Sequence, residues 1–236
     1  MNPIVIVSGG TKGIGKATIE QFMAAGFDVV TCARNETELF QLQKSLQEKY
    51  PANQLFVKAT NMALKTEVEA FVDFIHTIAR PVEVLVNNTG LFAPGQIHNE
   101  AEGTLESMID TNLYSAYYLT RGVVKEMIQR KKGHIFNLCS TASITAYTNG
   151  GAYCISKFAL YGMTKVLREE LKPYGIKVTA ILPGATLTAS WEGVDLPPER
   201  FIQAKDVAET IWSAYNLSSG AVVEEILIRP QLGDIS

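Results

Sequence analysis

Tyr153 and Lys157 lie four positions apart in the segment YCISK, and together they could transfer protons. On a helix, residues with this spacing project from one face about one turn apart. A phenol with an ordinary pKa of about 10 is a weak acid–base catalyst near neutral pH, but a neighbouring ammonium favours the phenolate and lowers that pKa. Such pairs are also common on ordinary protein surfaces, so their role depends on the elements around them.

A second segment with chemical potential is SGGTKGIG, which occupies residues 8–15. It follows the apolar run PIVIV and opens the stretch KATIEQFMAAGF, which has the pattern of a helix. Gly13 and Gly15 permit backbone angles that other residues resist, so a simple tight turn is one interpretation. The other is a loop that brings the backbone close to a phosphate at the start of a helix.

Apolar, strand-like runs alternate with helical patterns along the chain. These runs lie at residues 3–8, 28–33, 54–59, 82–88, 134–139, 176–182 and 222–229. The segments between them are long enough for crossover helices, and within residues 111–128 an apolar stripe passes through Leu113, Tyr117, Thr120, Val124 and Ile128. This pattern predicts an α/β fold with a single Rossmann-type, doubly wound parallel sheet of about seven strands and helices on both faces. We find no repeat or linker, so residues 1–236 are expected to form one domain.

The predicted fold favours the phosphate interpretation of the glycine segment. In a doubly wound sheet, the turn from the first strand to the first helix lies at the carboxyl end of the sheet. There, glycines let the backbone approach a pyrophosphate, whose charge is held by amide groups at the positive end of the helix. A dinucleotide is therefore the expected ligand.

Composition and charge exclude several other classes of function. The 236 residues carry a net charge of −3 with both signs interspersed, so neither a nucleic-acid partner nor a membrane surface is expected. The first residues, MNPIVIVSGG, have no positive leader and no apolar run long enough to span a bilayer. Three cysteines without paired spacing and three distant histidines predict no disulfide framework and no metal site. We expect a cytoplasmic protein that acts on a small molecule.

Further motifs extend along nearly the whole chain. NNTG at residues 87–90 ends the fourth strand-like run, Ser140 lies thirteen positions before Tyr153, and PGATLT occupies residues 183–188. Together with S-G-x-x-x-G-x-G at residues 8–15, Y-x-x-x-K at residues 153–157 and Asn112, they make the chain resemble the classical short-chain dehydrogenase/reductase family, of the NADP-preferring carbonyl reductase type. Each motif alone is weakly specific. Five of them in the right order, each at a predicted strand end or helix start, are a specific signal.

The resemblance implies four catalytic residues, which are Asn112, Ser140, Tyr153 and Lys157. Tyr153 would give a proton to the substrate oxygen, and the Ser140 hydroxyl would hydrogen-bond the substrate carbonyl. Lys157 would supply charge beside Tyr153 and hold the ribose hydroxyls. Asn112 would kink its helix and bind a water in a proton relay to Lys157. Ser143 lies near Ser140, but the family spacing selects Ser140.

The resemblance also implies a dinucleotide site that draws on every motif. Its expected residues are Gly9, Thr11, Lys12, Gly13, Ile14, Gly15, Arg34, Asn61, Asn88, Thr89, Gly90, Tyr153, Lys157, Pro183, Gly184, Thr186 and Thr188. In this family, the proline–glycine turn holds the nicotinamide carboxamide, which gives that role to Pro183 and Gly184.

Three residues in or beside these motifs need separate interpretation. Thr89 replaces the usual alanine of N-N-A-G. Asn61 stands where many members carry an aspartate that accepts a hydrogen bond from adenine, and an asparagine oxygen can accept the same bond. Cys154 lies between Tyr153 and Lys157, and we interpret it as a small packing residue because no resolving cysteine is evident.

Lys12 and Arg34 indicate which dinucleotide the site prefers. In a dehydrogenase that prefers NAD, the second strand commonly ends in an acidic residue that binds the ribose 2′-hydroxyl and repels a 2′-phosphate. Here Ala33 occupies that position and Arg34 follows it. In the family that the chain resembles, a basic residue before the middle glycine and an arginine past strand 2 clamp the 2′-phosphate, and Lys12 and Arg34 match both. NADP(H) is the expected cofactor; the alternative is a pair of solvated surface cations.

The expected reaction is the NADPH-dependent reduction of a ketone or aldehyde to an alcohol. The substrate loop, at about residues 187–204, is short for the family, which predicts an open cleft that Trp191 and Leu196 could line. A 3-oxoacyl-[acyl-carrier-protein] reductase and a sepiapterin-like reductase are the alternatives, although the ending VVEEILIRPQLGDIS lacks the glycine-rich tail common to the former. A dinucleotide-binding sensor without catalysis is a remote alternative, because such proteins usually lose the tyrosine or lysine.

The helical segments at residues 104–130 and 152–172 carry apolar stripes that are too broad for one packed face. Enzymes of the family that the chain resembles associate through these two helices. We therefore expect a homo-oligomer, a tetramer or alternatively a dimer.

Overall fold

A single parallel sheet forms the centre of the computed structural model, which describes residues 1–188 and 195–234. Its strands are β1 (Ile4–Ser8), β2 (Asp28–Ala33), β3 (Leu55–Ala59), β4 (Val82–Asn87), β5 (Gly133–Leu138), β6 (Ile176–Pro183) and β7 (Glu225–Ile228). They are ordered β3-β2-β1-β4-β5-β6-β7, and every neighbouring pair is parallel. β1 and β4 are buried along their whole length, which explains why apolar residues stand at consecutive positions in both strands, at residues 4–7 and 84–86, rather than alternating with polar ones. The predicted strands are confirmed, and β7 begins three residues later than predicted.

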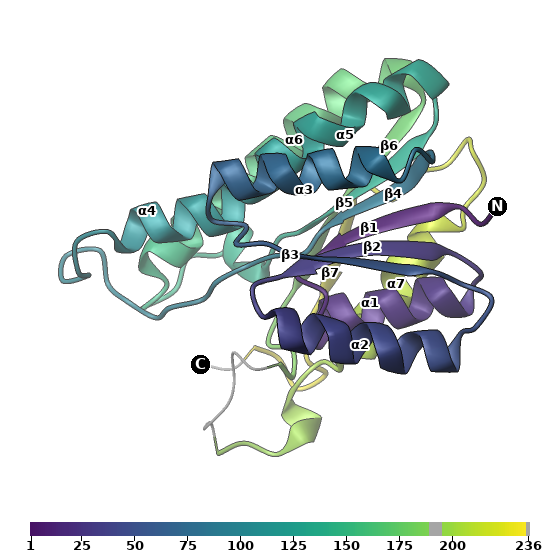
Figure 1. The fold of residues 1–236 in the computed structure, drawn as a ribbon. Coiled ribbons are helices and arrows are strands. Elements are labelled where there is room, and N and C mark those ends of the chain that lie inside the picture. Colours follow the sequence, from purple (N-terminus) through teal and green to yellow (C-terminus); the bar gives the residue numbers. More distant parts are fainter. Residues whose placement is uncertain (189–194, 235–236) are drawn as a thin grey trace.

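Helices cover both faces of this sheet (Figure 1). On one face lie α1 (Gly13–Ala24), α2 (Glu36–Lys49) and α7 (Ala204–Tyr215), and on the other lie α3 (Lys65–Thr77), α5 (Ser115–Arg130) and α6 (Gly151–Leu171). The short helix α4 (Thr104–Ile109) continues into α5 through a π-helical turn at Asp110–Tyr114. The predicted doubly wound, Rossmann-type α/β sheet is therefore confirmed. The strand order reverses between β1 and β4, and in such sheets ligands bind at the carboxyl ends of the strands near this point.

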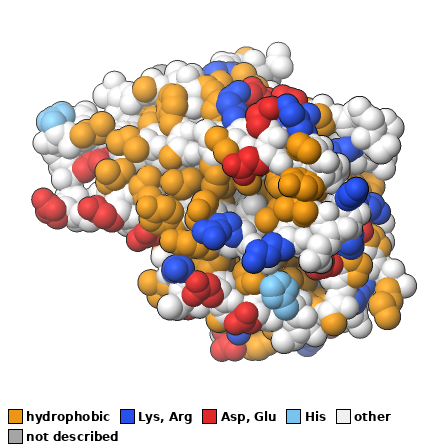
Figure 2. All heavy atoms as spheres, turned by 90° about the horizontal axis from the view of Figure 1, so that it is seen from above, with side chains coloured by type: hydrophobic (Ala, Val, Ile, Leu, Met, Phe, Trp, Pro, Cys, Tyr) orange, Lys and Arg blue, Asp and Glu red, His pale blue; other side chains and the backbone are white. Residues whose placement is uncertain are grey.

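The buried face of α5 differs from the predicted stripe. Its most buried apolar side chains are Ala116, Leu119, Val123 and Met127. Of the predicted stripe, Thr120 is buried, but Tyr117 is 41% exposed. The predicted stripe begins at Leu113, which lies in the π-helical turn, where the wider turn changes the register of the helix faces. The predicted stripe thus follows the flank of the buried face, and Figure 2, which views this side of the molecule, shows hydrophobic side chains gathered on its surface.

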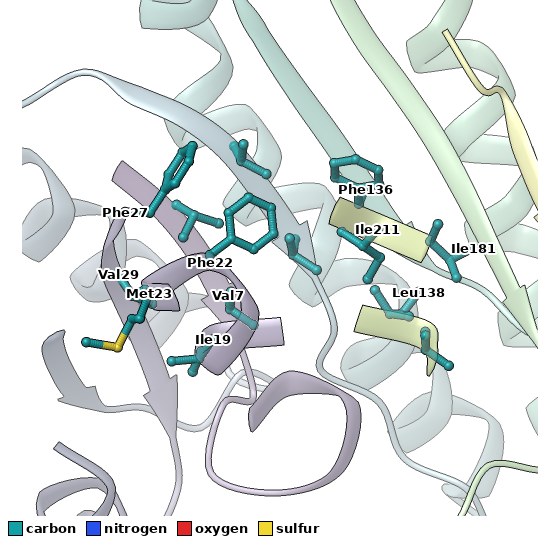
Figure 3. Packing of buried hydrophobic residues seen from close by; sticks show 14 of the residues in the cluster. Val7, Ile19, Phe22, Met23, Phe27, Val29, Phe136, Leu138, Ile181 and Ile211 are labelled. Atoms are coloured by element: carbon teal, nitrogen blue, oxygen red, sulfur yellow. The ribbon is translucent and has the colours of Figure 1, made fainter. Parts of the chain in front are cut away.

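The core under α1 holds the first helix firmly against the sheet (Figure 3). Phe22 of α1 is fully buried and meets Phe27 edge-on, with ring centroids 5.1 Å apart. Trp212 of α7 packs edge-on against Phe22 at 5.4 Å, and Ile211 and Phe136 belong to the same cluster. Aromatic pairs in this geometry add to the stabilisation from burial. The packing fixes the direction of α1 and therefore the position of the glycine loop that precedes it.

Candidate active site

The carboxyl ends of the strands border a cleft of about 1640 Å³. In Figure 1 these ends lie toward the side that carries α4. The predicted residues that line the cleft are Gly9, Thr11, Lys12, Gly13, Ile14, Arg34, Asn61, Asn88, Thr89, Gly90, Ser140, Tyr153, Lys157, Pro183, Gly184, Thr186 and Thr188. Gly15 and Asn112 are not among the lining residues. A cleft of this size exceeds an ordinary small-ligand pocket and has room for a dinucleotide and a second molecule.

The glycine loop presents backbone N–H groups to the cleft. α1 begins at Gly13, and no side chain caps its first turn. Gly13 has a φ of +54°, a backbone conformation that residues other than glycine rarely adopt. A Cβ added at Gly15 would lie only 2.3 Å from the carbonyl oxygen of Gly9, so this glycine lets the helix pack on the loop. Uncapped N–H groups at the positive end of a helix fit the pyrophosphate of a dinucleotide.

The loop is held in place by Ser8 and Asn88, which come from the ends of two neighbouring strands. The Asn88 Nδ2 atom donates to the carbonyl oxygens of Ser8 and Gly9, both at 2.9 Å. The Ser8 Oγ atom accepts from the backbone N–H groups of Asn88 and Thr89, at 3.0 and 3.1 Å. Beside them, the Oγ1 atom of Thr89 is buried without a hydrogen-bond partner at the edge of the cleft. The residue that replaces the family's alanine therefore offers a hydroxyl where a cofactor would pass.

Lys12 and Arg34 both line the cleft. The Lys12 ammonium pairs with the carboxylate of Glu38 in the first turn of α2, with Nζ and Oε1 3.0 Å apart. Ala33 ends β2, as predicted, so no carboxylate stands at that position. Glu38 was not predicted, because its approach to Lys12 depends on how α2 packs.

Tyr153 is the third residue of α6 and points into the cleft. The ring of Phe92 packs edge-on against it, with centroids 4.9 Å apart and an interplanar angle of 84°. Burial raises the pKa of Tyr153, and a hydrogen bond with the Ser140 side chain lowers it. The burial effect is the larger of the two, so the phenol is held in its protonated form.

Lys157 lies one turn further along α6, and its Nζ atom is 5.8 Å from the centre of the Tyr153 ring. This ammonium donates a hydrogen bond of 2.7 Å to the carbonyl oxygen of Leu138. Burial lowers the pKa of Lys157 to about 8. The expectation that Lys157 lowers the pKa of Tyr153 is wrong for this structure, because desolvation dominates at both groups and shifts each toward its neutral form.

Ser140 lines the cleft directly after β5. Its Oγ atom accepts a hydrogen bond of 3.1 Å from the backbone N–H of Ala142, and it keeps the contact with Tyr153 described above. Ser143 is fully buried, and its Oγ atom accepts from the backbone N–H of Ser140 at 3.1 Å. The structure thus separates the two serines, because Ser140 faces the cleft and Ser143 supports its backbone.

Asn112 lies in the π-helical turn, so its helix is irregular at this residue, and its side chain is completely buried. Its side chain accepts from the N–H of Leu91 at 2.7 Å and donates to the Leu91 carbonyl at 3.0 Å. It also donates to the Ser156 hydroxyl at 2.8 Å. The Oδ1 atom of Asn112 and the Nζ atom of Lys157 each lie 3.5 Å from the point where a Cβ on Gly90 would stand. A glycine at position 90 keeps the space between these two groups open.

The turn after β6 closes the far side of the cleft. Pro183 is the last residue of β6, and the Thr186 Oγ1 atom donates to the carbonyl oxygen of Gly184 at 3.0 Å. At the other end, the Oδ1 atom of Asn61 accepts from the N–H of Ala63 at 3.2 Å, so part of its accepting capacity is already used by the backbone. Local hydrogen bonds between side chain and backbone therefore hold the chain in shape at residues 184–186 and at residues 61–63.

Two aromatic residues that line the cleft were not predicted from the sequence. Phe92 and Tyr147 line it together with Leu196, which was predicted. Trp191, the other predicted lining residue, lies outside the described residues. Phe92 stands two positions after the glycine of NNTG, and this spacing was the one signal available for it.

The described part of the chain holds no group of three or more His, Cys, Asp or Glu side chains that could bind a metal. Within that same part, no helix is long and apolar enough to cross a membrane. Cys32, Cys139 and Cys154 are free and buried. Burial raises the pKa of the Cys154 thiol, which disfavours the reactive thiolate and agrees with a packing role.

Comparison with known proteins agrees with this geometry. Residues 3–197 match the family model described as short chain dehydrogenase. The chain is 28% identical over 241 residues to a sepiapterin reductase of Chlorobaculum tepidum, covering 100% of this chain and 99% of the relative. A metagenomic short-chain oxidoreductase in complex with NADP has a TM-score of 0.84 at 25% identity, covering 97% of both chains. A variant actinorhodin polyketide ketoreductase with NADPH has a TM-score of 0.88 at 26% identity, covering 99% and 98%.

The family model spans most of the chain, including the glycine loop, β4 with NNTG, and the first turn of α6 with Tyr153. The relatives extend the match over essentially the full length. The sequence motifs, the sheet order and these matches have one common explanation, which is that this chain is an oxidoreductase belonging to the short chain dehydrogenase family.

Proposed function

We propose that the protein reduces a small-molecule ketone or aldehyde to an alcohol with NADPH. The observation that carries the proposal is the position of Tyr153, whose protonated phenol shares one cleft with Ser140, Lys157 and the glycine loop. A proton donor is what the oxygen of a carbonyl needs as it is reduced. We further propose that residues 1–236 form a single dinucleotide-binding and catalytic domain.

The residues of the cleft fit a dinucleotide at several points. The uncapped N–H groups at Gly13 would hold the pyrophosphate, the unpartnered Thr89 hydroxyl would bind the cofactor chain, and Asn61 would contact the adenine. Lys157 would hold the ribose hydroxyls and the turn at Gly184 the carboxamide. Hydride transfer is the chemistry that the bound nicotinamide supplies.

The side chains of this chain supply binding, orientation and the proton. The Ser140 hydroxyl would hydrogen-bond the substrate carbonyl oxygen and stabilise the negative charge that develops on it. The Tyr153 hydroxyl would give that oxygen its proton. The edge-on contact with Phe92 restricts the Tyr153 ring and keeps one side of it away from water. Asn112 would complete a water-mediated relay that returns a proton toward Lys157.

NADP(H) is the proposed cofactor because Lys12 and Arg34 both line the cleft and would hold the ribose 2′-phosphate. Charge-assisted hydrogen bonds to phosphate are among the stronger polar contacts in proteins. The relatives that were solved with NADP or NADPH support this choice. The pairing of Lys12 with Glu38 means that the lysine must leave or share a carboxylate when the phosphate binds.

A sepiapterin-like reduction is the second candidate for the substrate, and the similarity to the Chlorobaculum tepidum enzyme favours it. The 3-oxoacyl-[acyl-carrier-protein] reductase and the non-catalytic sensor are further alternatives. Purified protein with NADPH and a panel of ketones, aldehydes, diketones, sepiapterin and 3-oxoacyl thioesters distinguishes them by the loss of NADPH absorbance. Turnover of simple carbonyls supports the proposal, turnover of one alternative substrate alone replaces it, and binding without turnover identifies a sensor.

The proposal includes a homo-oligomer, a tetramer or alternatively a dimer. Large apolar side chains on the π-helical turn, α5 and α6 remain exposed, among them Tyr114, Tyr117 and Phe158 at 41–44%. Figure 2 shows hydrophobic side chains on the surface of this side of the molecule. Exposed apolar surface of this kind often marks a protein interface. Light scattering at micromolar concentration tests the assembly, and a 25.8 kDa particle contradicts it. The three free cysteines fit the reducing cytoplasm that we propose as its location.

A further inference from the structure

The first turn of α6 carries Tyr153 but has no cap of its own. Its N-cap residue is Gly150, and no local side chain accepts from the first N–H groups. The first four N–H groups of a helix lack partners within the helix, and an uncapped first turn is its least stable part. Tyr153 is the third residue of this turn, so its position depends on whatever satisfies these groups.

The cap comes from Glu100, which is 52 residues earlier in the chain. The Oε1 atom of its carboxylate accepts a hydrogen bond of 2.9 Å from the backbone N–H of Ala152. A negative charge at the N-terminus of a helix is stabilising because it meets the positive end of the helix dipole. A hydrogen bond to a carboxylate is also stronger than one between neutral groups.

Two glycines make room for this carboxylate. A Cβ added at Gly151 would lie 1.9 Å from the Oε1 atom of Glu100, and one added at Gly95 would lie 2.6 Å from it. Real Cβ contacts of this length essentially do not occur. The carboxylate therefore occupies a space that only glycine backbones on both sides leave open.

Residues 92–100, the segment that ends with Glu100, contact the start of α6 and the residues just before it at several points. The N–H of Gly95 donates to the carbonyl oxygen of Asn149 at 3.0 Å, and the Gln96 side chain donates to the Asn149 side chain at 2.8 Å. The same segment begins with Phe92, whose ring packs on Tyr153. Residues 92–100 thus touch the first turn of α6 from both ends, and Glu100 is their charged contact.

We propose that Glu100 is a positioning residue, which orders the first turn of α6 and thereby holds Tyr153 against Phe92 and toward the substrate. This inference rests on the proposed function only for the role of Tyr153. Glu100 is not among the residues that line the cleft, so its removal should change the rate of the chemical step and leave cofactor binding unchanged.

The test uses Glu100→Ala and Glu100→Gln in the full-length protein, with Glu102→Ala as the matched control. Glu102 lies two residues further along the chain and is exposed. We expect Glu100→Ala to lower kcat about tenfold, equivalent to about 1.4 kcal/mol, with less than a twofold change in the Kd of NADPH. Glu100→Gln keeps an oxygen that can accept from Ala152, and we expect it to lose no more than about threefold.

Hydrogen exchange provides a readout that does not depend on catalysis. We expect the amides of residues 151–154 to exchange faster in Glu100→Ala, while those at the centre of α6 and the melting temperature stay close to wild type. Faster local exchange in a protein that lacks carbonyl reductase activity would support the cap and contradict the proposed function. Unchanged exchange, a kcat within twofold of wild type, or an equal loss in Glu102→Ala would overturn the inference about Glu100.

Discussion

Replacing Glu38 by glutamine tests how the proposed 2′-phosphate site works. The Glu38 carboxylate pairs with the Lys12 ammonium at 3.0 Å, and both side chains are partly exposed, at 32% and 65%. A phosphate that binds Lys12 must displace or share this carboxylate, and it also meets a charge of its own sign. Glu38→Gln keeps the shape of the side chain and removes both effects, so NADPH should bind more tightly.

The exposure of the pair sets the size of this effect. Coulomb attraction at 3.0 Å in water is about 1.4 kcal/mol, but ion pairs exposed to this extent contribute only about 0.2–1 kcal/mol net. Releasing Lys12 from the pair therefore gives roughly a 1.4- to 5-fold gain in affinity for a ligand with a 2′-phosphate. A ligand without the phosphate gains nothing. The gain should shrink as salt is added, because exposed charges are screened.

Isothermal titration with 2′,5′-ADP and 5′-AMP measures this without catalysis. Glu36→Gln is the matched control, since Glu36 is also an acidic residue in the first turn of α2 and does not line the cleft. We expect tighter binding of 2′,5′-ADP alone, in Glu38→Gln alone, and a smaller gain at high salt. An equal gain for 5′-AMP, an equal gain in Glu36→Gln, or weaker binding of 2′,5′-ADP would refute the reasoning.

Three further predictions concern the site residues. Tyr153→Phe should lower kcat by roughly 100- to 10,000-fold while the Kd of NADPH by fluorescence titration stays nearly unchanged, and more than a tenth of wild-type kcat would remove Tyr153 from its role. Wild type should prefer NADPH over NADH by roughly a hundredfold in kcat/KM. Arg34→Ala should raise the KM for NADPH about tenfold and have little effect on the KM for NADH. An equal rise in KM for NADPH and NADH contradicts this prediction. The difference in unfolding free energy between wild type and Lys157→Met should not change with pH below about 8, and it should rise in favour of wild type between about pH 8 and 10.5. In that window Lys157 is deprotonated in the folded state but protonated in the unfolded state, so the folded state binds fewer protons. A difference that does not change with pH argues against the lowered pKa of Lys157.

The sheet could be predicted because strands that are buried on both faces consist mostly of apolar residues. β1 and β4 are covered on both faces, so most of their residues are apolar and stand at consecutive positions, and turn residues separate the strands from the helices. The face of α5 could not be placed as well, because the π-helical turn at Asp110–Tyr114 has no signature in the spacing of apolar residues. One wider turn is enough to shift which side chains point at the sheet.

The residues of the candidate active site also fall into two groups, those whose roles depend on spacing within one element and those whose roles depend on tertiary contacts. Tyr153, Lys157 and the glycines could be predicted because their roles depend on spacing within one element. Phe92 and Glu100 could not, since their contacts with α6 join segments about 50–60 residues apart. Such contacts leave no periodic trace in the sequence, and the glycines that admit the Glu100 carboxylate read only as turn residues until the packing is known.

The electrostatics of Tyr153 and Lys157 bear on the direction of the proposed reaction. Burial raises the pKa of the phenol and lowers that of the ammonium to about 8, so without the cofactor the pair tends toward its two neutral forms. Carbonyl reduction needs a protonated Tyr153 as the acid, and this environment maintains it near neutral pH. Alcohol oxidation needs the phenolate, which burial disfavours and which only the Ser140 hydrogen bond assists. The same desolvation that contradicts the simple lysine argument therefore keeps Tyr153 in the protonated form that reduction requires, and a negatively charged cofactor beside Lys157 would favour the charged form of the lysine.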